Sequence, residues 1–467
     1  MKSGRAASPV WMECSGCGHR ATWQGTHPFA CPAAKPDDDI DHVLVRHIDT
    51  KRSSFPRAPV GNPYLDFAPL MSAWHRAQAA GMSEEDFRIG VQRLDDAVAG
   101  IDGHGFGMTP FSSVPELAQA VAPGIDLWAK DETDNVSGSH KSRHLMGVLV
   151  HLWLAEELGL VDKGQPRRPL AIASCGNAAL AAAVLARAAR WPLLVFVPED
   201  ADMAVLTRLH SLSAEVETCP RDGLPGDPCY RAFQTALGHG ALPFSVQGSD
   251  NGLAVEGGLT LGYELAHQIR SGPRRLDALV VQVGGGALAS ACLHALRDAV
   301  AWGVIPEMPR LYTVQTRSAW PLRRAFDRVV ERVAAGEVPP ADARERADWL
   351  RQRPPNVLDG ALRYAATHRK EFMWPWEQVP HSVAHGILDD ETYDWWALVD
   401  GMIRTGGRPL TVDESTLTTA HGAVQTHAGV QASATGTSGV AGVMQLHREG
   451  GLRPGEVVGV LLTGCER

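Results

Sequence analysis

The sequence has no uninterrupted apolar segment of the roughly 20 residues that are needed to cross a lipid bilayer. Its most apolar stretch, residues 170–197, is broken by Asn177, Arg187 and Arg190 and is typical of a buried strand–helix–strand unit. No basic start followed by an apolar run lies near residue 1, so we predict no signal peptide and expect a cytoplasmic protein. The formal net charge of −9 argues against a broad nucleic-acid-binding surface. We therefore expect neither a membrane nor a nucleic acid as a partner.

Cysteine is also sparse, with eight in 467 residues, and five of these are scattered, as is usual for packed free thiols in a cytoplasmic chain. The other three lie close to the N-terminus. Cys14 and Cys17 form a Cys-x-x-Cys sequence followed by glycine, which is typical of a zinc knuckle, and Cys31 is a candidate third ligand. No fourth cysteine completes the pattern. Two interpretations remain open: a Cys₃His zinc site completed by His27 or His42, and a degenerate ribbon that holds no metal.

The most informative residue is Lys141, which lies where a loop passes into a predicted helix. Residues 127–130 form a predicted short strand, and a polar segment with small residues, 131–140, follows it. Leucine and valine then recur at helical spacing from 145 to 158. The helix dipole disfavours a cation in the first turn, which lowers the pKa of the lysine and favours the neutral amine that attacks carbonyl groups. The alternative is an ordinary surface lysine at a helix start.

Two more strand–loop–helix junctions follow in order along the chain. Residues 169–174 form a predicted strand, the turn Ser174-Cys175-Gly176-Asn177 follows it, and residues 178–190 form a predicted helix. Residues 276–283 form another strand, which runs into Gly284-Gly285-Gly286-Ala287-Leu288 and a helix predicted from 289 to about 300. Free backbone N–H groups at such junctions bind anions, and glycine lets them close tightly around a phosphate.

The glycine-rich segment also satisfies the dinucleotide fingerprint G-x-G-x-x-A. That interpretation requires an acidic residue at the end of the next strand to hold a ribose. The next predicted strand, residues 310–315, ends in Gln315, so a nicotinamide-dependent oxidoreductase is poorly supported.

Taken together, these segments resemble the pyridoxal-phosphate (PLP) enzymes of fold type II, the tryptophan synthase β-subunit fold. The family's pattern around its cofactor lysine is close to K-D-E-x-x-N-P-T-G-S-F-K, and residues 130–141 read KDETDNVSGSHK. The resemblance implies that Lys141 binds the cofactor covalently and moves the α-proton. It also implies that the family's S-x-G-N loop binds the substrate carboxylate and, through its asparagine, the cofactor, and that a glycine-rich loop cradles the phosphate. A strand at 457–462 matches the family's strand ending in T-G, which implies that Thr463 faces the pyridine nitrogen. The implied residues are Ser174, Cys175, Gly176 and Asn177 for the first loop and Gly284, Gly285, Gly286, Ala287 and Leu288 for the cradle.

Finer matches, at Thr109-Pro110 and residues 256–264, resemble the threonine synthase and threonine dehydratase branch. The expected function is therefore that of a PLP-dependent lyase, threonine synthase-like, acting by elimination or replacement on an amino acid with a leaving group at Cβ or Cγ. Alternatives are a serine/threonine ammonia-lyase (dehydratase), a β-replacement synthase and an inactive regulatory protein that retains the cofactor. The resemblance also implies a homodimer.

The predicted fold class is α/β, with two doubly wound parallel-sheet domains. We expect a zinc-ribbon-like head at 1–50, a helical segment at 51–108 and a catalytic region at 109–467, with a smaller domain at about 141–225. An insertion at about 316–383 contains charged helices and an aromatic cluster. Its tryptophans could line the substrate entrance, contact a second protomer or pack a local core. The active site is expected between the domains, at the carboxyl ends of strands.

Overall fold

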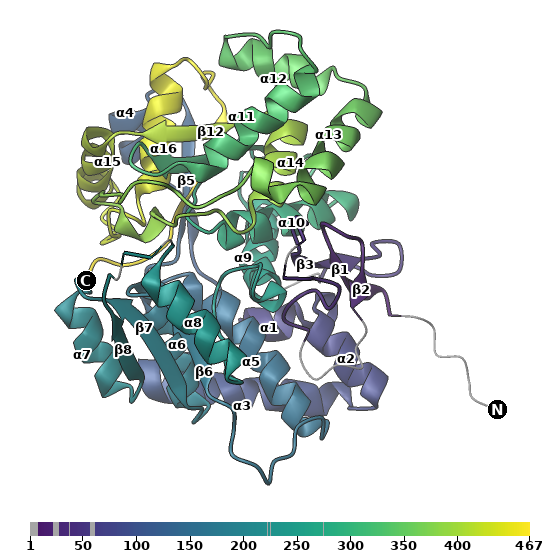
Figure 1. The fold of residues 1–467 in the computed structure, drawn as a ribbon. Helices are drawn as coiled ribbons and strands as arrows, with labels where there is room; N and C mark the ends of the chain where they lie inside the picture. Colours follow the sequence, from purple (N-terminus) through teal and green to yellow (C-terminus); the bar gives the residue numbers. More distant parts are fainter. Residues whose placement is uncertain are drawn as a thin grey trace.

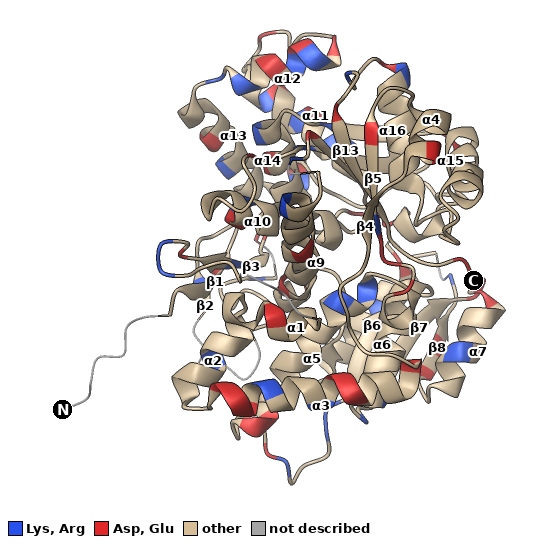
Figure 2. Ribbon diagram, turned by 180° about the vertical axis from the view of Figure 1, so that it is seen from behind, with Lys and Arg blue, Asp and Glu red and all other residues tan. Residues whose placement is uncertain are grey.

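Two parallel sheets with helices on both faces form the body of the protein, and a small antiparallel sheet lies beside them (Figure 1). The computed structural model describes residues 8–21, 28–36, 38–56, 61–221, 223–224, 226–273 and 275–467. Lysine and arginine are interspersed with aspartate and glutamate over the elements (Figure 2). Within these described ranges, no helix is both long enough and apolar enough to cross a membrane. The predicted α/β fold class is confirmed.

The larger sheet has six strands in the order β12-β11-β10-β13-β5-β4, and only β4 is antiparallel to its neighbour. β10 and β13 are buried along their whole length because helices cover both faces of the sheet. The carboxyl ends of the neighbouring parallel strands β10, β13 and β5 therefore meet at one edge. The strands are β4 (Phe111–Ser113), β5 (Asp126–Asp131), β10 (Ala278–Gln282), β11 (Arg310–Thr316), β12 (Pro409–Val412) and β13 (Val457–Leu462).

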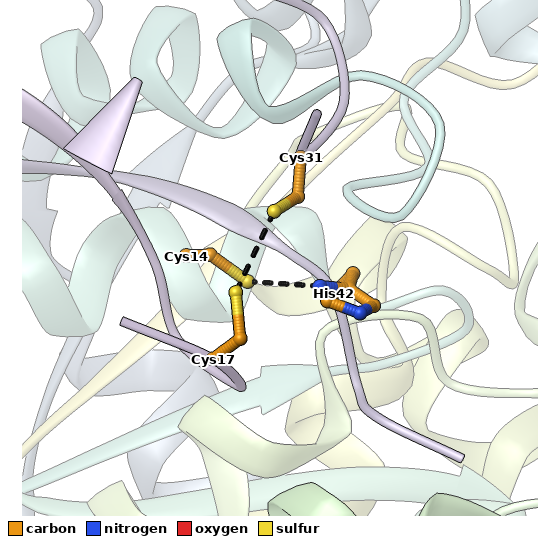
Figure 3. A group of neighbouring side chains, drawn as sticks. All are labelled: Cys14, Cys17, Cys31 and His42. Carbon is orange, nitrogen blue, oxygen red and sulfur yellow. Dashed lines mark hydrogen bonds between the residues drawn. The ribbon is translucent and has the colours of Figure 1, made fainter. Parts of the chain in front are cut away.

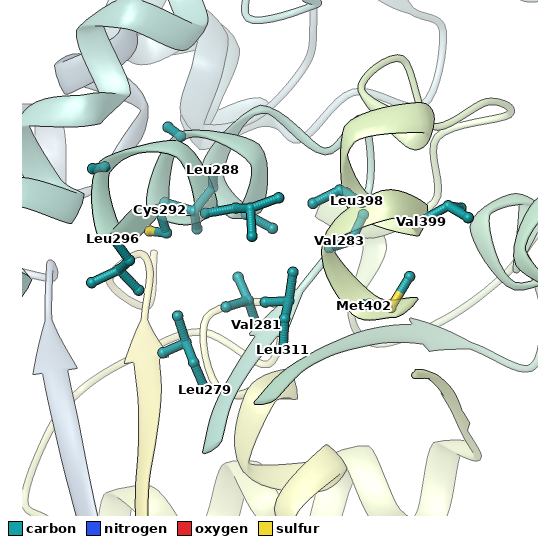
Figure 4. Packing of buried hydrophobic residues seen from close by; sticks show 14 of the residues in the cluster. Leu279, Val281, Val283, Leu288, Cys292, Leu296, Leu311, Leu398, Val399 and Met402 are labelled. Atoms are coloured by element: carbon teal, nitrogen blue, oxygen red, sulfur yellow. The ribbon is translucent and has the colours of Figure 1, made fainter. Parts of the chain in front are cut away.

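Helices cover the larger sheet in two layers. Figure 4 shows Leu288, Cys292 and Leu296 of one helix and Leu398 and Met402 of another packed against strand residues. Burial of each such side chain stabilises the fold by about 1.5–3 kcal/mol. This face carries α9 (Gly252–Ser271), α10 (Ala287–Ala301) and α14 (Trp395–Thr405), with α11 (Pro321–Ala334), α12 (Ala343–Arg351) and α13 (Pro355–Thr367) packed further out. The opposite face carries α4 (Pro115–Val121), α15 (Glu414–His427) and α16 (Ser438–Arg448).

The smaller sheet has four parallel strands in the order β8-β7-β6-β9. It extends past residue 225, the expected limit of the smaller domain, because β9 pairs with β6 as an edge strand. The strands are β6 (Leu170–Ala173), β7 (Leu193–Pro198), β8 (Glu215–Cys219) and β9 (Leu242–Pro243). The helices are α6 (Asn177–Ala188) and α7 (Met203–Ser211) on one face, α8 (Pro228–Gly238) on the other, and α5 (Lys141–Glu157), which packs on α6 and α9.

The N-terminal residues form a three-stranded antiparallel sheet followed by helices. In this sheet β1 pairs with both neighbours. The elements are β1 (Val10–Cys14), β2 (Arg20–Ala21), β3 (Leu44–Ile48), α1 (Pro63–Asp66), η1 (Ala68–Leu70), α2 (Ser72–Ala80) and α3 (Glu84–Asp102).

The expected insertion is part of the helical layer over the larger sheet, since α11 and α13 pack on α14. After α13 the chain continues through η3 (Arg369–Glu371) and η4 (His385–Ile387). The Arg324 guanidinium lies 3.7 Å from the ring centroid of Trp374 and 5.1 Å from that of Trp376. Trp376 also meets Trp320 edge to face, with centroids 5.0 Å apart. These tryptophans therefore pack locally against α11, which was one of the three alternatives.

Candidate active site

Loops from both sheets converge at the carboxyl edge of the larger sheet. β5 leads toward Lys141, β13 ends directly before Thr463, and β10 ends just before Gly284. From the smaller sheet, the turn after β6 reaches the same edge: a Cβ added to Gly464 would lie 2.5 Å from Nδ2 of Asn177. The structure thus brings residues from four separate segments, all predicted from the sequence, into one neighbourhood.

Lys141 is the first residue of α5, as the sequence predicts, and the residue before it ties the helix start to β13. The backbone N–H of His140 donates to the Thr463 carbonyl at 3.1 Å, and Nδ1 of its ring lies 2.9 Å from the same oxygen. Since a carbonyl only accepts, Nδ1 carries the proton. Burial lowers the pKa of Lys141, and the carboxylate of Asp389 opposes that shift. His140 therefore positions the lysine, whose environment favours the neutral amine.

The loop before the lysine is strained at one position. η2 (Val136–Gly138) contains Ser137 with φ of 57°, in the left-handed region that non-glycine residues rarely adopt. Its N–H donates to Oδ2 of Asp102 at 2.7 Å, and its carbonyl accepts from Nη2 of Arg467 at 2.5 Å. Such strain persists only where the surrounding contacts enforce it, and it concentrates at functional sites.

A buried charge network lies beneath the lysine. Lys130 donates to Oε1 of Glu264 at 2.5 Å, and the Arg143 guanidinium bonds Glu132 at 2.7 Å and Glu264 at 2.9 Å. All four side chains are at most 1% exposed. Burial alone would raise the pKa of Glu132, but Arg143 and Lys130 hold it below its usual value. The first and third residues of the family-like K-D-E segment are therefore structural here, joining β5, α5 and α9.

The glycine-rich segment forms the N-terminal end of α10. Gly286 is its N-cap, with φ of 100°, and Ala287 and Leu288 belong to the first turn. The segment after the insertion lies against this cradle: the Thr392 hydroxyl donates to the Gly284 carbonyl at 3.0 Å, and the Asp394 N–H donates to the Gly285 carbonyl at 3.0 Å. The Gly285 N–H donates to the Asp389 carboxylate, and the N–H groups of the first turn of α10 are the part of the loop suited to a further anion.

Asp389 lies beside the cradle and was not predicted. A Cβ added to Gly284 would overlap Oδ2 of Asp389, so a side chain there would displace the Asp389 carboxylate. Burial raises the pKa of Asp389, while Lys141 and the N–H of Gly285 act in the opposite direction. Asp389 follows η4 closely in the chain, and no motif in the sequence indicated it.

Gln282, at the end of β10, orients Thr463. Its Nε2 donates to Oγ1 of Thr463 at 2.7 Å and to the carbonyls of Gly436 and Leu461 at 2.9 and 3.2 Å. The two carbonyls only accept, which fixes the direction of the amide. Because the Thr463 oxygen accepts from Gln282, its own proton is free to be donated to a bound group. The sequence could have indicated Gln282, because it is a polar residue at the end of an otherwise apolar strand.

In the turn after β6, Ser174 Oγ accepts from the Gly176 N–H at 3.4 Å. Asn177 is the first residue of α6, and its Oδ1 accepts from Nε of Arg467 at 3.0 Å. Burial raises the pKa of Cys175, and the Asp200 carboxylate adds to that effect. The turn therefore offers N–H groups and a neutral thiol.

The N-terminal cysteines form a second cluster, away from the strand ends (Figure 3). One ligand atom from each of Cys14, Cys17, Cys31 and His42 lies within 4.8 Å of all the others. Nε2 of His42 lies 3.1 Å from Oδ2 of Asp38, an arrangement that orients histidines toward metals. His42 is thus the fourth member of the cluster, and His27, the other candidate, lies outside the described residues.

A lysine at a helix start, a glycine cradle and a hydroxyl at neighbouring strand ends would suit a cofactor that carries a phosphate and a carbonyl group. Residues 104–464 match the sequence family described as "Pyridoxal-phosphate dependent enzyme", and the chain belongs to this family.

Individual curated proteins and solved structures resemble this chain at low sequence identity. A serine dehydratase-like protein of Rattus norvegicus is 28% identical over 214 residues, which are 45% of this chain and 58% of the relative, so somewhat more than half of its length is spanned. The human serine dehydratase-like protein is 30% identical over 204 residues, 42% of this chain and 56% of its own length. Threonine deaminase isoform 2 from Solanum lycopersicum has a TM-score of 0.56 at 12% identity, covering 83% of this chain and 92% of its own. Maize serine racemase has a TM-score of 0.53 at 16% identity, covering 81% and 93%. These structures show the shared fold.

The residues at the strand ends fit PLP. The left-handed Gly286 and the N-terminal turn of α10 suit a phosphate dianion, and the lowered pKa of Lys141 suits covalent attachment. Thr463 has a proton to donate to the pyridine nitrogen, because Gln282 already occupies its oxygen as a donor.

Proposed function

We propose that the protein is a PLP-dependent lyase that removes the hydroxyl group from a serine- or threonine-type amino acid and releases a 2-oxo acid and ammonia. The observation that carries the proposal is the convergence of Lys141, Thr463 and the glycine cradle at three adjacent strand ends. The similarity to serine dehydratase-like proteins supports this substrate class.

Each predicted residue has a role in this proposal. Gly284–Leu288 would hold the phosphate, Thr463 would donate to the ring nitrogen, and Lys141 would be the attachment point. When bound, PLP supplies an electron sink for negative charge at the substrate α-carbon. The neutral Lys141 amine accepts the α-proton, and N–H groups of the Ser174–Asn177 turn bind the substrate carboxylate. Thr463 is a neutral hydroxyl donor, which would leave the ring nitrogen of a bound cofactor unprotonated and would favour elimination over transamination.

The test is formation of 2-oxo acid by purified protein supplied with PLP and L-serine or L-threonine. We expect turnover with at least one of them and none in the Lys141→Ala variant. Unchanged turnover in that variant would sink the assignment, and so would inactivity toward both substrates.

A threonine synthase-like replacement reaction is the second candidate. The cysteine-containing head favours it, because threonine synthase-like sequences often begin with such a ribbon, whereas the match at residues 256–264 is common to both reactions. Formation of threonine and phosphate from O-phosphohomoserine would distinguish it from elimination. A homodimer and a cytoplasmic location, both expected from the sequence, remain proposals.

We also propose that the head holds one Zn²⁺ ion through Cys14, Cys17, Cys31 and His42. Three thiolates and one imidazole within 4.8 Å of each other match the donor set of structural zinc sites. Metal analysis should find close to one equivalent; less than about a tenth of an equivalent would contradict the site.

A further inference from the structure

We propose that the metal site in the head sets the affinity of the glycine cradle for the cofactor's phosphate, with Asp41 as the positioning residue that links the two. This inference rests on the proposed PLP and zinc sites. Asp41 neighbours the ligand His42 in sequence and contacts the segment that lies against the cradle.

The metal cluster fixes the backbone at residues 41–43 directly. A Cβ added to Gly16, within the Cys-x-x-Cys turn, would overlap the Asp41 carbonyl oxygen, so the turn and Asp41 are in contact. The Ser15 N–H donates to the Val43 carbonyl at 2.9 Å. His42 lies between these two positions and belongs to the cluster itself. Metal binding would therefore fix the backbone of residues 41–43 through the Gly16 contact, the Ser15 hydrogen bond and His42.

The Asp41 side chain points away from the cluster into the body of the protein. It is 3% exposed, and its Oδ1 accepts from Nε1 of Trp395 and from Nε of Arg369, both at 3.1 Å. Its backbone N–H donates to the Ala366 carbonyl at 2.8 Å. Arg369 also pairs with Glu391. Asp41 therefore holds both ends of the segment 391–395, Trp395 directly and Glu391 through Arg369.

That segment forms one side of the cradle. Thr392 and Asp394 hold the carbonyls of Gly284 and Gly285, and a Cβ added to Gly286 would lie 3.0 Å from Cγ2 of Thr392 and 3.1 Å from Cβ of Asp394. A shift of Trp395 is therefore transmitted to the glycines through a single intervening residue, Asp394.

The framework of the head is held by the body, since Met12 and Leu44 are buried in a core cluster and β3 packs on α9. The metal would instead fix the Cys-x-x-Cys turn and residues 41–43 within that framework. Loss of the metal would release Asp41, deprive Arg369 and Trp395 of their shared acceptor, and loosen the cradle. Couplings of this kind typically change affinity by about 5- to 150-fold, and we expect a roughly tenfold weaker Kd for PLP.

The experiment compares full-length wild type, Cys31→Ser, Asp41→Ala and Asp39→Ala. Zinc content is measured by metal analysis, the Kd for PLP by absorbance titration, and folding by thermal unfolding. Asp39 is the matched control: it accepts from the Lys370 N–H at 2.7 Å in the same part of the head, but its carboxylate has no contact with the segment 391–395 among the described residues. We expect Cys31→Ser to lose zinc and PLP affinity together, Asp41→Ala to keep zinc but bind PLP about tenfold more weakly, and Asp39→Ala to match wild type.

The effect of PLP on zinc binding provides a further measurement, because a purely structural role of Asp41 would not link the two affinities. If zinc strengthens PLP binding, saturating PLP must tighten the equilibrium Kd for zinc by the same factor, measured by competition with a chelator at equilibrium, in wild type but not in Asp41→Ala. The inference is overturned if folded, zinc-loaded Asp41→Ala binds PLP as tightly as wild type, or if wild type holds no zinc. Failure of wild type itself to bind PLP would instead refute the proposed function.

Discussion

Nε of Arg143 donates to Oε2 of Glu132 at 2.7 Å, and both side chains are fully shielded from water. Arg143 lies two residues after the candidate catalytic Lys141 on α5, whereas Glu132 follows β5. The pair therefore fixes the catalytic end of the helix to the sheet. The charged K-D-E segment that precedes the lysine therefore serves to position the start of α5 against the sheet.

Arg143→Met should destabilise the protein strongly, because it leaves the Glu132 carboxylate buried without its paired cation and the Glu264 carboxylate with Lys130 alone. Breaking such a pair costs about 3–5 kcal/mol in the free energy of unfolding, measured by urea denaturation. Arg88→Met is the control, since Arg88 pairs with Glu84 on the exposed surface of α3 at 3.3 Å. That change should cost at most about 1 kcal/mol. Equal losses in the two variants would refute the structural role of the network.

Burial lowers the pKa of both Lys130 and Lys141, yet only Lys141 should form a borohydride-reducible adduct with PLP. Nζ of Lys130 donates to Thr109 at 2.7 Å, Glu264 at 2.5 Å and Gln268 at 2.9 Å, so its amine is fully engaged. Peptide mapping after reduction checks this. A reduced adduct at position 130 would count against the proposed site.

Gln282→Leu should reduce turnover while leaving the fold intact. The change removes the donor that orients Thr463 and leaves the Gly436 and Leu461 carbonyls with one partner fewer, which costs about 1–3 kcal/mol of stability. We expect an altered absorbance spectrum of bound PLP and a kcat lower by roughly ten- to a hundredfold, as for other lost positioning contacts. Gln234→Leu, on the surface of α8, is the control and should leave the spectrum unchanged. A wild-type spectrum in Gln282→Leu would mean that Thr463 needs no orienting partner.

The stability of the wild type should fall as the pH rises from about 4 to about 8, in part because of Asp394. Burial raises the pKa of Asp394 to about 8, the Asp41 carboxylate adds to the shift, and the Gly248 N–H opposes it. The folded state therefore keeps a proton that the unfolded chain, with a pKa of about 3.9, has released. The proton on Asp394 contributes its full stabilisation below the pKa of the unfolded chain, and this contribution is lost as the pH rises through the pKa of the folded state. Over this range the free energy of unfolding falls by at most about 1.4 kcal/mol per pH unit. Urea unfolding at several pH values should give a flatter profile for Asp394→Asn, and parallel profiles would contradict the assignment.

Asp389→Asn should lower the pKa of Lys141 further, because the Asp389 carboxylate favours the ammonium form. The rate of adduct formation with PLP should then reach its plateau at a lower pH than in wild type. The neighbouring change Asp390→Asn serves as the control, since the structure assigns Asp390 no effect on the Lys141 pKa. A pH profile identical to that of wild type would remove Asp389 from the site.

The strand–loop–helix junctions could be predicted because buried parallel strands are continuous apolar runs and because glycine marks close turns. The boundaries shifted slightly: α10 begins at Ala287 rather than 289, because the left-handed Gly286 caps it. Gln282 and Asp389 were missed for a physical reason. Gln282 lies 181 residues from Thr463 in sequence, and only the packing of β10 against β13 brings them together. Pairing of His42 with the cysteines was left open for the same reason, since its partners lie on another strand and turn.

Helices α5 and α9 cross backbone against backbone: a Cβ added to Gly147 would overlap Cα of Gly257, and one added to Gly257 would lie 2.5 Å from the His144 carbonyl. In a saturation-mutagenesis library selected for altered substrate choice, codons 147 and 257 should therefore stay fixed, since even alanine there pushes α5 sideways and carries Lys141 with it. Variants with altered substrate choice should therefore carry their changes outside this crossing.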